Sequence, residues 1–152
     1  MRREEKKITD RDTLEAIIRQ ASVCRLALCD HGVPYIVPVC FGYKDNNLYF
    51  HSGAGGRKLE ILDRNNLVCF EMDIDTRLVV GSKPCDWSMN YLSVIGTGHA
   101  YLVQDPEEKV EALNQIMNHY SGPPGDYDKE TLDKTTVIRI EIESMTGKKS
   151  GY

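Results

Sequence analysis

The residues best suited to chemistry lie between His51 and Lys58, in the run HSGAGGRK. A strand-like run ends at the histidine, a glycine-rich loop follows, and Arg57 and Lys58 open a helix predicted over 56–63. Glycines let backbone N–H groups approach an anion closely, and a helix N-terminus adds partial positive charge. Two cations at that end are disfavoured unless an anion lies beside them. The pattern predicts an anion site such as a phosphate site; solvated cations are the alternative.

Two predicted strands must position this loop. They cover residues 33–43 and 48–51 and are joined by a polar turn at 44–47. The first strand contains Pro34 and Pro38, which cannot donate a hydrogen bond to a neighbouring strand. We therefore expect this strand to have an edge, a bulge or a ligand beside it.

The rest of the chain alternates between helical and extended patterns. Periodicity predicts helices over 9–20, 106–120 and 129–134, and strands over 23–29, 67–72, 88–103 and 136–142. Gly96 and Gly98 interrupt the longest strand, which indicates bending or close approach of a ligand or another chain. Six or so antiparallel strands predict a mainly β fold, a small barrel with peripheral helices, as one domain over 1–152. Residues 1–8 alternate in charge and are expected to form a flexible, solvated arm.

Composition limits the classes of function. Lys plus Arg number 19 and Asp plus Glu number 23, a net charge of −4 that disfavours nucleic acid as a partner. No apolar run approaches the roughly 20 residues that cross a bilayer, and the N-terminus has no signal-peptide core, so we expect no membrane partner and a cytoplasmic location.

The five cysteines are expected to be free thiols. Their odd number and the lack of CxxC spacing disfavour a disulfide framework and a zinc site, and no metal is expected. Cys24, Cys29, Cys40 and Cys69 lie in apolar strand-like runs and are expected to be buried, whereas Cys85 lies in a predicted loop.

Three segments together carry a family resemblance: PYIVPVCFGYKDNNLYFHSGAGGRKLEIL, YLSVIGTGHAYLV and the closing TGK of residues 146–148. They resemble the pyridoxamine 5′-phosphate oxidase-like flavin-binding split barrels, and within that group the nitroimidazole-resistance (Nim) type proteins. The resemblance extends over residues 24–148. It implies a split β-barrel and a homodimer that binds flavin mononucleotide (FMN) in a groove between its subunits, with FAD as the alternative flavin.

The resemblance also implies a set of flavin contacts. Lys58, with Arg57 and Ser52, would hold the phosphate through a point charge, a bidentate fork and a hydroxyl. Three residues of the proline-bearing strand would lie along the isoalloxazine ring, the alternative being an ordinary edge strand: Pro38, Val39 and Cys40.

Four further residues have two interpretations each. Arg25 is either a phosphate ligand or an outward-facing salt-bridge residue. Ser93 and Ile95 are flavin contacts by resemblance, or members of a plain core strand. His51 would project over the flavin by analogy with the Nim proteins and orient a substrate or donate a proton; otherwise its ring only ends the strand.

The resemblance implies a flavin-dependent oxidoreductase. Electrons from NAD(P)H would pass through the flavin to a nitroaromatic, nitroimidazole-like acceptor or to another small oxidant. One alternative is a flavin-binding store or sensor without turnover. Another is a haem-binding split barrel in which His51, His99 or His119 supplies the axial ligand.

Overall fold

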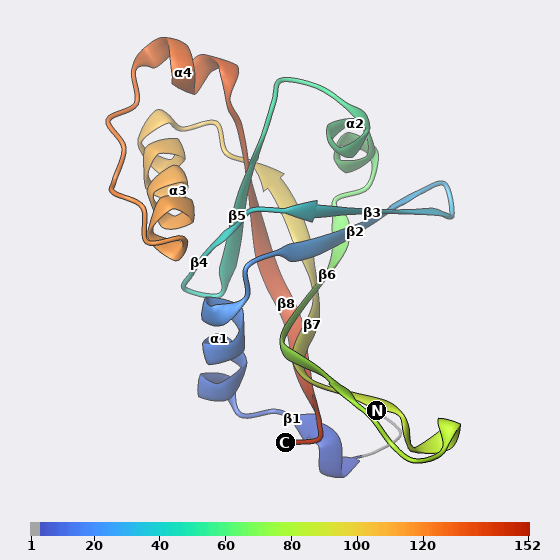
Figure 1. Ribbon diagram of the computed structural model, residues 1–152. Coiled ribbons are helices and arrows are strands. Elements are labelled where there is room, and N and C mark those ends of the chain that lie inside the picture. Colours follow the sequence, from blue (N-terminus) through green and yellow to red (C-terminus); the bar gives the residue numbers. More distant parts are fainter. Residues whose placement is uncertain (1–3) are drawn as a thin grey trace.

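The computed structural model describes residues 4–152 and contains one antiparallel sheet (Figure 1). The strand order is β3-β2-β6-β7-β8-β5-β4, with β1 paired to β8. The described strands are β1 Lys7–Ile8, β2 Cys24–Asp30, β3 Val33–Val39, β4 Gly42–Lys44, β5 Asn47–Ser52, β6 Leu67–Val79, β7 Ser88–Leu102 and β8 Thr136–Ser150. The mainly β, antiparallel architecture is confirmed, with eight strands in the described chain where about six were expected.

Four α-helices lie around the sheet in the described chain. They are α1 Arg11–Gln20, α2 Arg57–Arg64, α3 Pro106–His119 and α4 Lys129–Lys134. The side chains of Asp10, Asp105 and Asp128 cap three of them by accepting a hydrogen bond from a first-turn N–H. None of the described helices is long and apolar enough to cross a bilayer.

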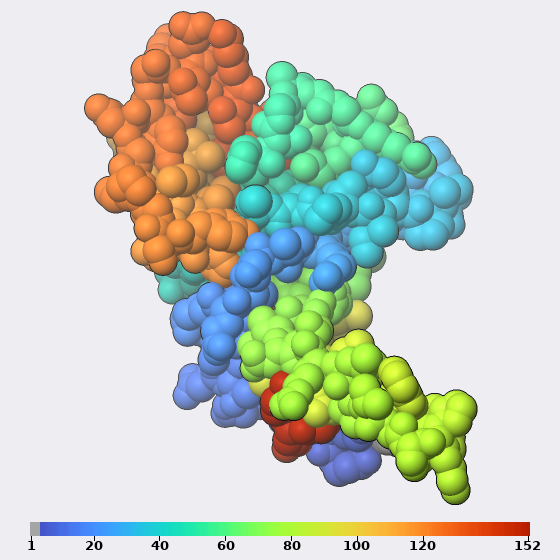
Figure 2. All heavy atoms as spheres, in the orientation of Figure 1, coloured from blue at the N-terminus to red at the C-terminus, as the bar shows by residue number. Residues whose placement is uncertain are grey.

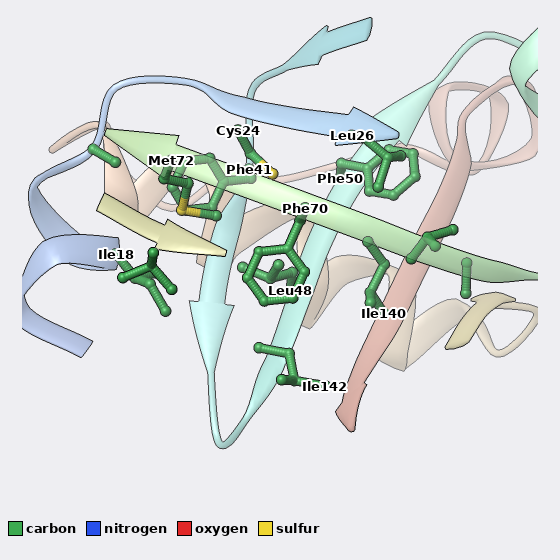
Figure 3. Close-up of a cluster of buried hydrophobic side chains, with 14 of the residues drawn as sticks. Ile18, Cys24, Leu26, Phe41, Leu48, Phe50, Phe70, Met72, Ile140 and Ile142 are labelled. Carbon is green, nitrogen blue, oxygen red and sulfur yellow. The ribbon is translucent and has the colours of Figure 1, made fainter. Parts of the chain in front are cut away.

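The main core cluster lies inside the curled sheet (Figure 3). Both ends of the sheet contribute to it, because Val37 and Val39 of β3 pack against the cluster that contains Leu48 and Phe50 of β5. A second, smaller cluster joins α3 to Val137 on the outer side of β8. Consecutive residues Val137 and Ile138 are therefore both buried, one under α3 and one inside the sheet.

The segment predicted as one strand over 33–43 is two strands separated at Cys40 and Phe41. Phe41 is buried, and its N–H donates to the Tyr120 hydroxyl at 3.2 Å, whose own O–H donates to the Ser22 carbonyl at 2.9 Å. The end of α3 thus provides the partner that a neighbouring strand would otherwise supply, and the chain can turn from β3 into β4.

Strands β6 and β8 are longer than predicted, and the far part of β6 and β7 forms a projecting two-stranded ribbon (Figures 1 and 2). The alternation that marks a half-buried strand is absent there, because neither face of the ribbon packs on the core. Its large apolar side chains are exposed: Leu78, Val80, Trp87 and Met89.

The expected flexible arm over 1–8 is corrected in part. Residues 1–3 lie outside the described residues, but Lys7 and Ile8 pair with Lys148 and Gly147 of β8. Ile8 is buried in the main core, and its apolar side chain explains why the segment docks.

The glycine at position 96 accommodates this chain's own core. A Cβ there would meet the Phe70 ring and would lie 2.5 Å from the Ser144 carbonyl oxygen. The close approach at Gly96 therefore comes from β6 and β8 of this chain itself, where a ligand or another chain was expected from the sequence.

Candidate functional site

The predicted anion site lies at the start of α2. Gly56 caps the helix with φ of 113°, a conformation that glycine adopts without strain, and no side chain caps this end. Lys58 is half-buried in the first turn, with its amine 5.1 Å from the centroid of the Phe50 ring. Burial lowers the pKa of the Lys58 amine below its usual value. Among residues 4–152, no carboxylate forms an ion pair with Lys58 or Arg57.

Arg57 connects this end of α2 to the edge strand β3. Its guanidinium lies 4.9 Å from the centroid of the Tyr35 ring, within the range of a cation–π contact. At the other end of the helix, Arg64 forms an ion pair with Asp30 at 2.9 Å. Both ends of α2 are thus fixed to the β2–β3 hairpin, and its first turn lies between β3 and β5.

Ser52 and His51 lie on opposite faces of β5. Alternation along the strand places Ser52 on the same face as buried Phe50, whose ring lies beneath the Lys58 amine. The exposed His51 lies on the other face, with Tyr49. In the sheet register, His51 pairs with Val137 of β8. Strand β4 pairs with β5 only as far as Tyr49. In the described sheet, the end of β5 therefore has a partner on one side only, and its backbone is open there.

The proline-bearing strand β3 is an edge of the sheet, one of the three arrangements expected from its prolines, since it pairs only with β2 in the described chain. Val39 is half-buried and packs on the core, whereas Pro38 and Cys40 are exposed. Of the three predicted ring contacts, Pro38 and Cys40 thus face outward, and Val39 presents only its backbone to a ligand at this edge.

Arg25 forms ion pairs on the outer face of the sheet. It donates to Glu71 at 3.0 Å and to Asp73 at 2.5 Å, so two carboxylates already balance its charge. Of the two interpretations of Arg25, these contacts match the outward-facing salt-bridge residue. Register places Pro38, Arg25, Glu71 and Ile95 in one cross-strand row. Desolvation, with Asp73 nearby, raises the pKa of the Glu71 carboxyl.

Ser93 and Ile95 lie on the same outer face. Ile95 is half exposed, and half-buried Ser93 pairs with Asp73 and Lys148. The candidates thus form two groups on one chain: an anion site at α2, and an outer-face row that includes Pro38, Arg25 and Ile95. Strand β3 belongs to both groups, through Tyr35 and Pro38.

Several contacts at these groups are not predicted from the sequence. Tyr35, Phe50, Glu71 and Asp73 all touch candidate residues through long-range packing or pairing. Tyr35 has a local signal, because it is an aromatic residue between the two prolines of its strand. The two carboxylates have no local signal, because the 46-residue separation between Arg25 and Glu71 is closed only by the sheet.

The cysteine prediction is wrong at two positions. Cys24 is buried, and burial raises the pKa of its thiol to about 12, but Cys29 and Cys40 are exposed. Cys29 lies on the outward face of β2, and Cys40 lies in the break between β3 and β4, so a strand-like run did not imply burial of each member. No group of three or more metal-ligating side chains occurs within the described residues.

Comparisons with known proteins agree with this fold. Residues 10–149 match the family model described as pyridoxamine 5′-phosphate oxidase. The structure of a candidate 5-nitroimidazole antibiotic resistance protein from Bacteroides thetaiotaomicron is 38% identical, with a TM-score of 0.85 over 93% of this chain and 85% of that one. Among curated proteins, none has significant sequence similarity to the chain.

Two more distant structures share the fold. An FAD and haem binding protein from Mycobacterium smegmatis is 20% identical, with a TM-score of 0.86 over 97% of this chain and 74% of that one. An FAD-binding protein from Mesorhizobium loti is 22% identical, with a TM-score of 0.71 over 96% of this chain and 98% of that one. These matches confirm the split-barrel fold expected from the sequence.

Proposed function

The chain belongs to the pyridoxamine 5′-phosphate oxidase family, and we propose that it is a flavin-dependent oxidoreductase that passes electrons from NAD(P)H to a nitroaromatic or other small oxidant. The observation that carries this proposal is the half-buried Lys58, which has no carboxylate partner among residues 4–152. An uncompensated, partly desolvated cation beside an open helix N-terminus favours an anionic ligand.

The residues of this site fit the phosphate of a flavin. In the proposal Lys58 and Arg57 hold the phosphate, Ser52 donates its hydroxyl, and the glycine loop offers backbone N–H groups. The isoalloxazine ring lies along the free edge of β3, where Pro38 has no N–H to pair with a neighbouring strand and Cys40 is exposed. The phosphate position is common to FMN, the simpler ligand, and to FAD.

Bound flavin supplies hydride acceptance from the nicotinamide and electron delivery to the acceptor. The chain itself provides binding and orientation. His51 is the candidate to orient the acceptor or donate a proton to it, because its imidazole is exposed at the open end of β5. The 38% identity to a candidate nitroimidazole resistance protein supports a nitroaromatic acceptor.

The proposal includes a homodimer. On one chain the anion site and the row containing Arg25 and Ile95 lie in separate groups, and His51 faces away from Ser52. A second copy can bring the outer-face row of one subunit to the anion site of the other and so close a groove around the flavin. Exposed Ile95, with half its surface accessible, is consistent with an interface on that face.

A second candidate function is haem binding. Two of the candidate axial histidines already have hydrogen-bond partners. His119 Nε2 lies 2.7 Å from the Ala21 carbonyl oxygen, and His99 Nδ1 lies 3.3 Å from the Asn66 side-chain oxygen. Exposed His51 has no such partner among the described residues and remains the axial candidate. The Mycobacterium smegmatis structure, whose protein binds haem as well as FAD, favours keeping this alternative.

The test is an absorption spectrum of the purified protein before and after addition of FMN, with gel filtration to separate free cofactor. We expect flavin bands that co-elute with protein, followed by NADH or NADPH oxidation that depends on a nitroimidazole acceptor. Flavin retention without donor oxidation would instead support the store or sensor. A sharp Soret band would favour haem, and retention of neither cofactor would refute the proposal.

A further inference from the structure

Tyr120, the residue that caps the C-terminal end of α3, joins two segments that are far apart in the sequence. Its hydroxyl donates to the Ser22 carbonyl at 2.9 Å and accepts from the Phe41 N–H at 3.2 Å. Ser22 lies just before β2, and Phe41 lies just after β3. One hydroxyl group therefore holds both strands of the β2–β3 hairpin at the open end of that hairpin.

His119, the last residue of α3, supports this contact. Its Nε2 lies 2.7 Å from the Ala21 carbonyl oxygen, and its ring centroid lies 4.2 Å from that of Phe41 and 4.8 Å from that of Tyr120. Aromatic rings at such separations attract one another. The Tyr120 ring is thus packed in place, so removal of its hydroxyl would break two hydrogen bonds and leave the ring contacts intact.

The phenol of Tyr120 is suited to act as a constant donor. Burial raises its pKa, and the neighbouring Cys40 thiol adds to this rise. An ordinary tyrosine has a pKa of about 10, so a phenol with a raised pKa stays protonated at neutral pH. The bond to the Ser22 carbonyl is therefore present throughout the range in which flavin binding would be measured.

The end of β3 that Tyr120 holds is the end beside which we propose that the flavin ring lies. Pairing of β3 with β2 ends at Val39, which is opposite Cys24. Cys40 and Phe41 follow without a strand partner, in the break before β4. The course of the chain at Cys40 thus depends on how Phe41 is held.

The proposed phosphate site is held by different contacts. Arg57 lies over the Tyr35 ring, and Lys58 lies over the Phe50 ring. These cations belong to α2, whereas Tyr120 belongs to the end of α3. The two ends of the proposed flavin site are therefore positioned by separate helices, and each can be disturbed without the other.

We propose that Tyr120 is a positioning residue for the isoalloxazine ring. Through the Phe41 N–H it fixes Cys40 and the end of β3 against one edge of the ring. This inference rests on the proposed flavin site and adds to it a residue from a helix that no sequence pattern connects with that site. Without the hydroxyl, the chain at Cys40 is free to shift, and the ring loses its fixed orientation while the phosphate stays bound.

The test compares Tyr120→Phe with the wild type in three measurements: FMN titration, visible circular dichroism of the bound flavin, and alkylation of Cys40 in the FMN complex. The dissociation constant should stay within about threefold, because the phosphate contacts are intact. The circular dichroism should fall by about half, and Cys40 should be labelled about fivefold faster, as expected when a hydrogen bond that orders the chain is lost.

Tyr120→Trp is a second variant that separates the two hydrogen bonds. An indole N–H can donate to the Ser22 carbonyl, but it cannot accept from the Phe41 N–H. Because the inference assigns the effect to Phe41, this variant should match Tyr120→Phe in both the circular dichroism and the labelling of Cys40.

Tyr43→Phe is the matched control. Tyr43 is a half-buried tyrosine on β4, beyond the same break, and its hydroxyl donates to Glu15 at 3.0 Å. This variant should behave as the wild type does in all three measurements.

Two outcomes would refute the positioning role alone. One is wild-type circular dichroism and labelling in both Tyr120 variants. The other is a loss of FMN affinity in Tyr120→Phe as large as that in Lys58→Ala, because Tyr120 would then act on the phosphate end. A wild type that binds no flavin would refute the proposed function and, with it, this inference.

Discussion

The guanidinium of Arg57 lies 4.9 Å from the centroid of the Tyr35 ring, and this contact ties the first turn of α2 to edge strand β3. The next residue, Lys58, faces the other way and lies over Phe50 of β5. Two consecutive cations thus link edge strand β3 to β5, whose end is open beyond its pairing with β4. A ligand bound there would contact both free edges, which is why this place is the best candidate for a cofactor site.

Loss of the Lys58 amine should weaken flavin binding more than loss of the His51 imidazole does. Lys58→Ala removes a charge from the proposed phosphate site, and we expect the dissociation constant for FMN to rise about 10- to 100-fold. His51→Ala should bind FMN as the wild type does but change kcat or KM with a nitroaromatic acceptor. Equal flavin retention by both variants would contradict the phosphate assignment, and unchanged kinetics would make His51 structural.

Flavin affinity should fall at alkaline pH. Burial lowers the pKa of Lys58 in the free protein, and a bound phosphate favours the charged amine. Above the lowered pKa the free protein must take up a proton to bind, so affinity declines as pH rises through it. Titrations of FMN between pH 7 and 10.5 would show this decline.

Lys58→Arg is the control for that titration, since arginine stays charged throughout the range. Ionisation of the flavin affects both proteins equally, so the difference between their curves reports Lys58. Parallel curves would mean that Lys58 does not contact the phosphate.

Thiol labelling should distinguish three classes of cysteine. At pH 8 the exposed Cys29, Cys40 and Cys85 should react with an alkylating reagent first, half-buried Cys69 more slowly, and Cys24 only after unfolding. The pKa of about 12 keeps the Cys24 thiol protonated and unreactive.

Addition of FMN should then slow labelling of Cys40 while leaving Cys29 unchanged, with the sites read by mass spectrometry. Both residues lie on or beside the β2–β3 hairpin, but only Cys40 is at the proposed ring position. Equal protection of the two, or protection of neither, would argue against a flavin along β3.

Substitution of Gly96 should destabilise the protein. The added Cβ of Gly96→Ala would press on Phe70 and the Ser144 carbonyl, and we expect a loss of about 1–3 kcal/mol in urea denaturation. Gly53→Ala is the control: a Cβ at Gly53 meets no atom within 4 Å, and its effect should stay within about 0.5 kcal/mol. A tolerated Gly96→Ala would mean that β7 and β8 are less tightly packed than the structure shows.

The projecting ribbon should contribute to self-association. Leu78 and Trp87 are 52% and 51% exposed, and a two-stranded ribbon is only marginally stable without a partner. We expect the double variant Leu78→Ser/Trp87→Ser to shift the protein from dimer to monomer in sedimentation velocity at micromolar concentration. Met117→Ser on α3, with Met117 at 37% exposure, should have no effect on association. A monomeric wild type would refute the dimer itself.

Local signals in the sequence determined much of the fold. Asp10 and Asp105 mark helix starts that the structure places within two residues of the predictions. The prolines of residues 33–39 indicated an edge, a bulge or a ligand, and the edge is what the sheet shows. The Gly56–Lys58 pattern predicted the start of α2. Each of these features depends on residues near one another in the chain, so spacing and side-chain type are sufficient.

Only the tertiary structure decided what the candidate residues touch. Arg25 pairs with Glu71 and Asp73 because β2 and β6 are neighbours, a pairing that no local pattern encodes. The exposure of Cys40, the docking of Ile8 on the core and the contact between Gly96 and Phe70 have the same origin. The sequence specified the chemistry available at each position, whereas strand order and register selected the contacts, because burial and long-range pairing exist only once the sheet has formed.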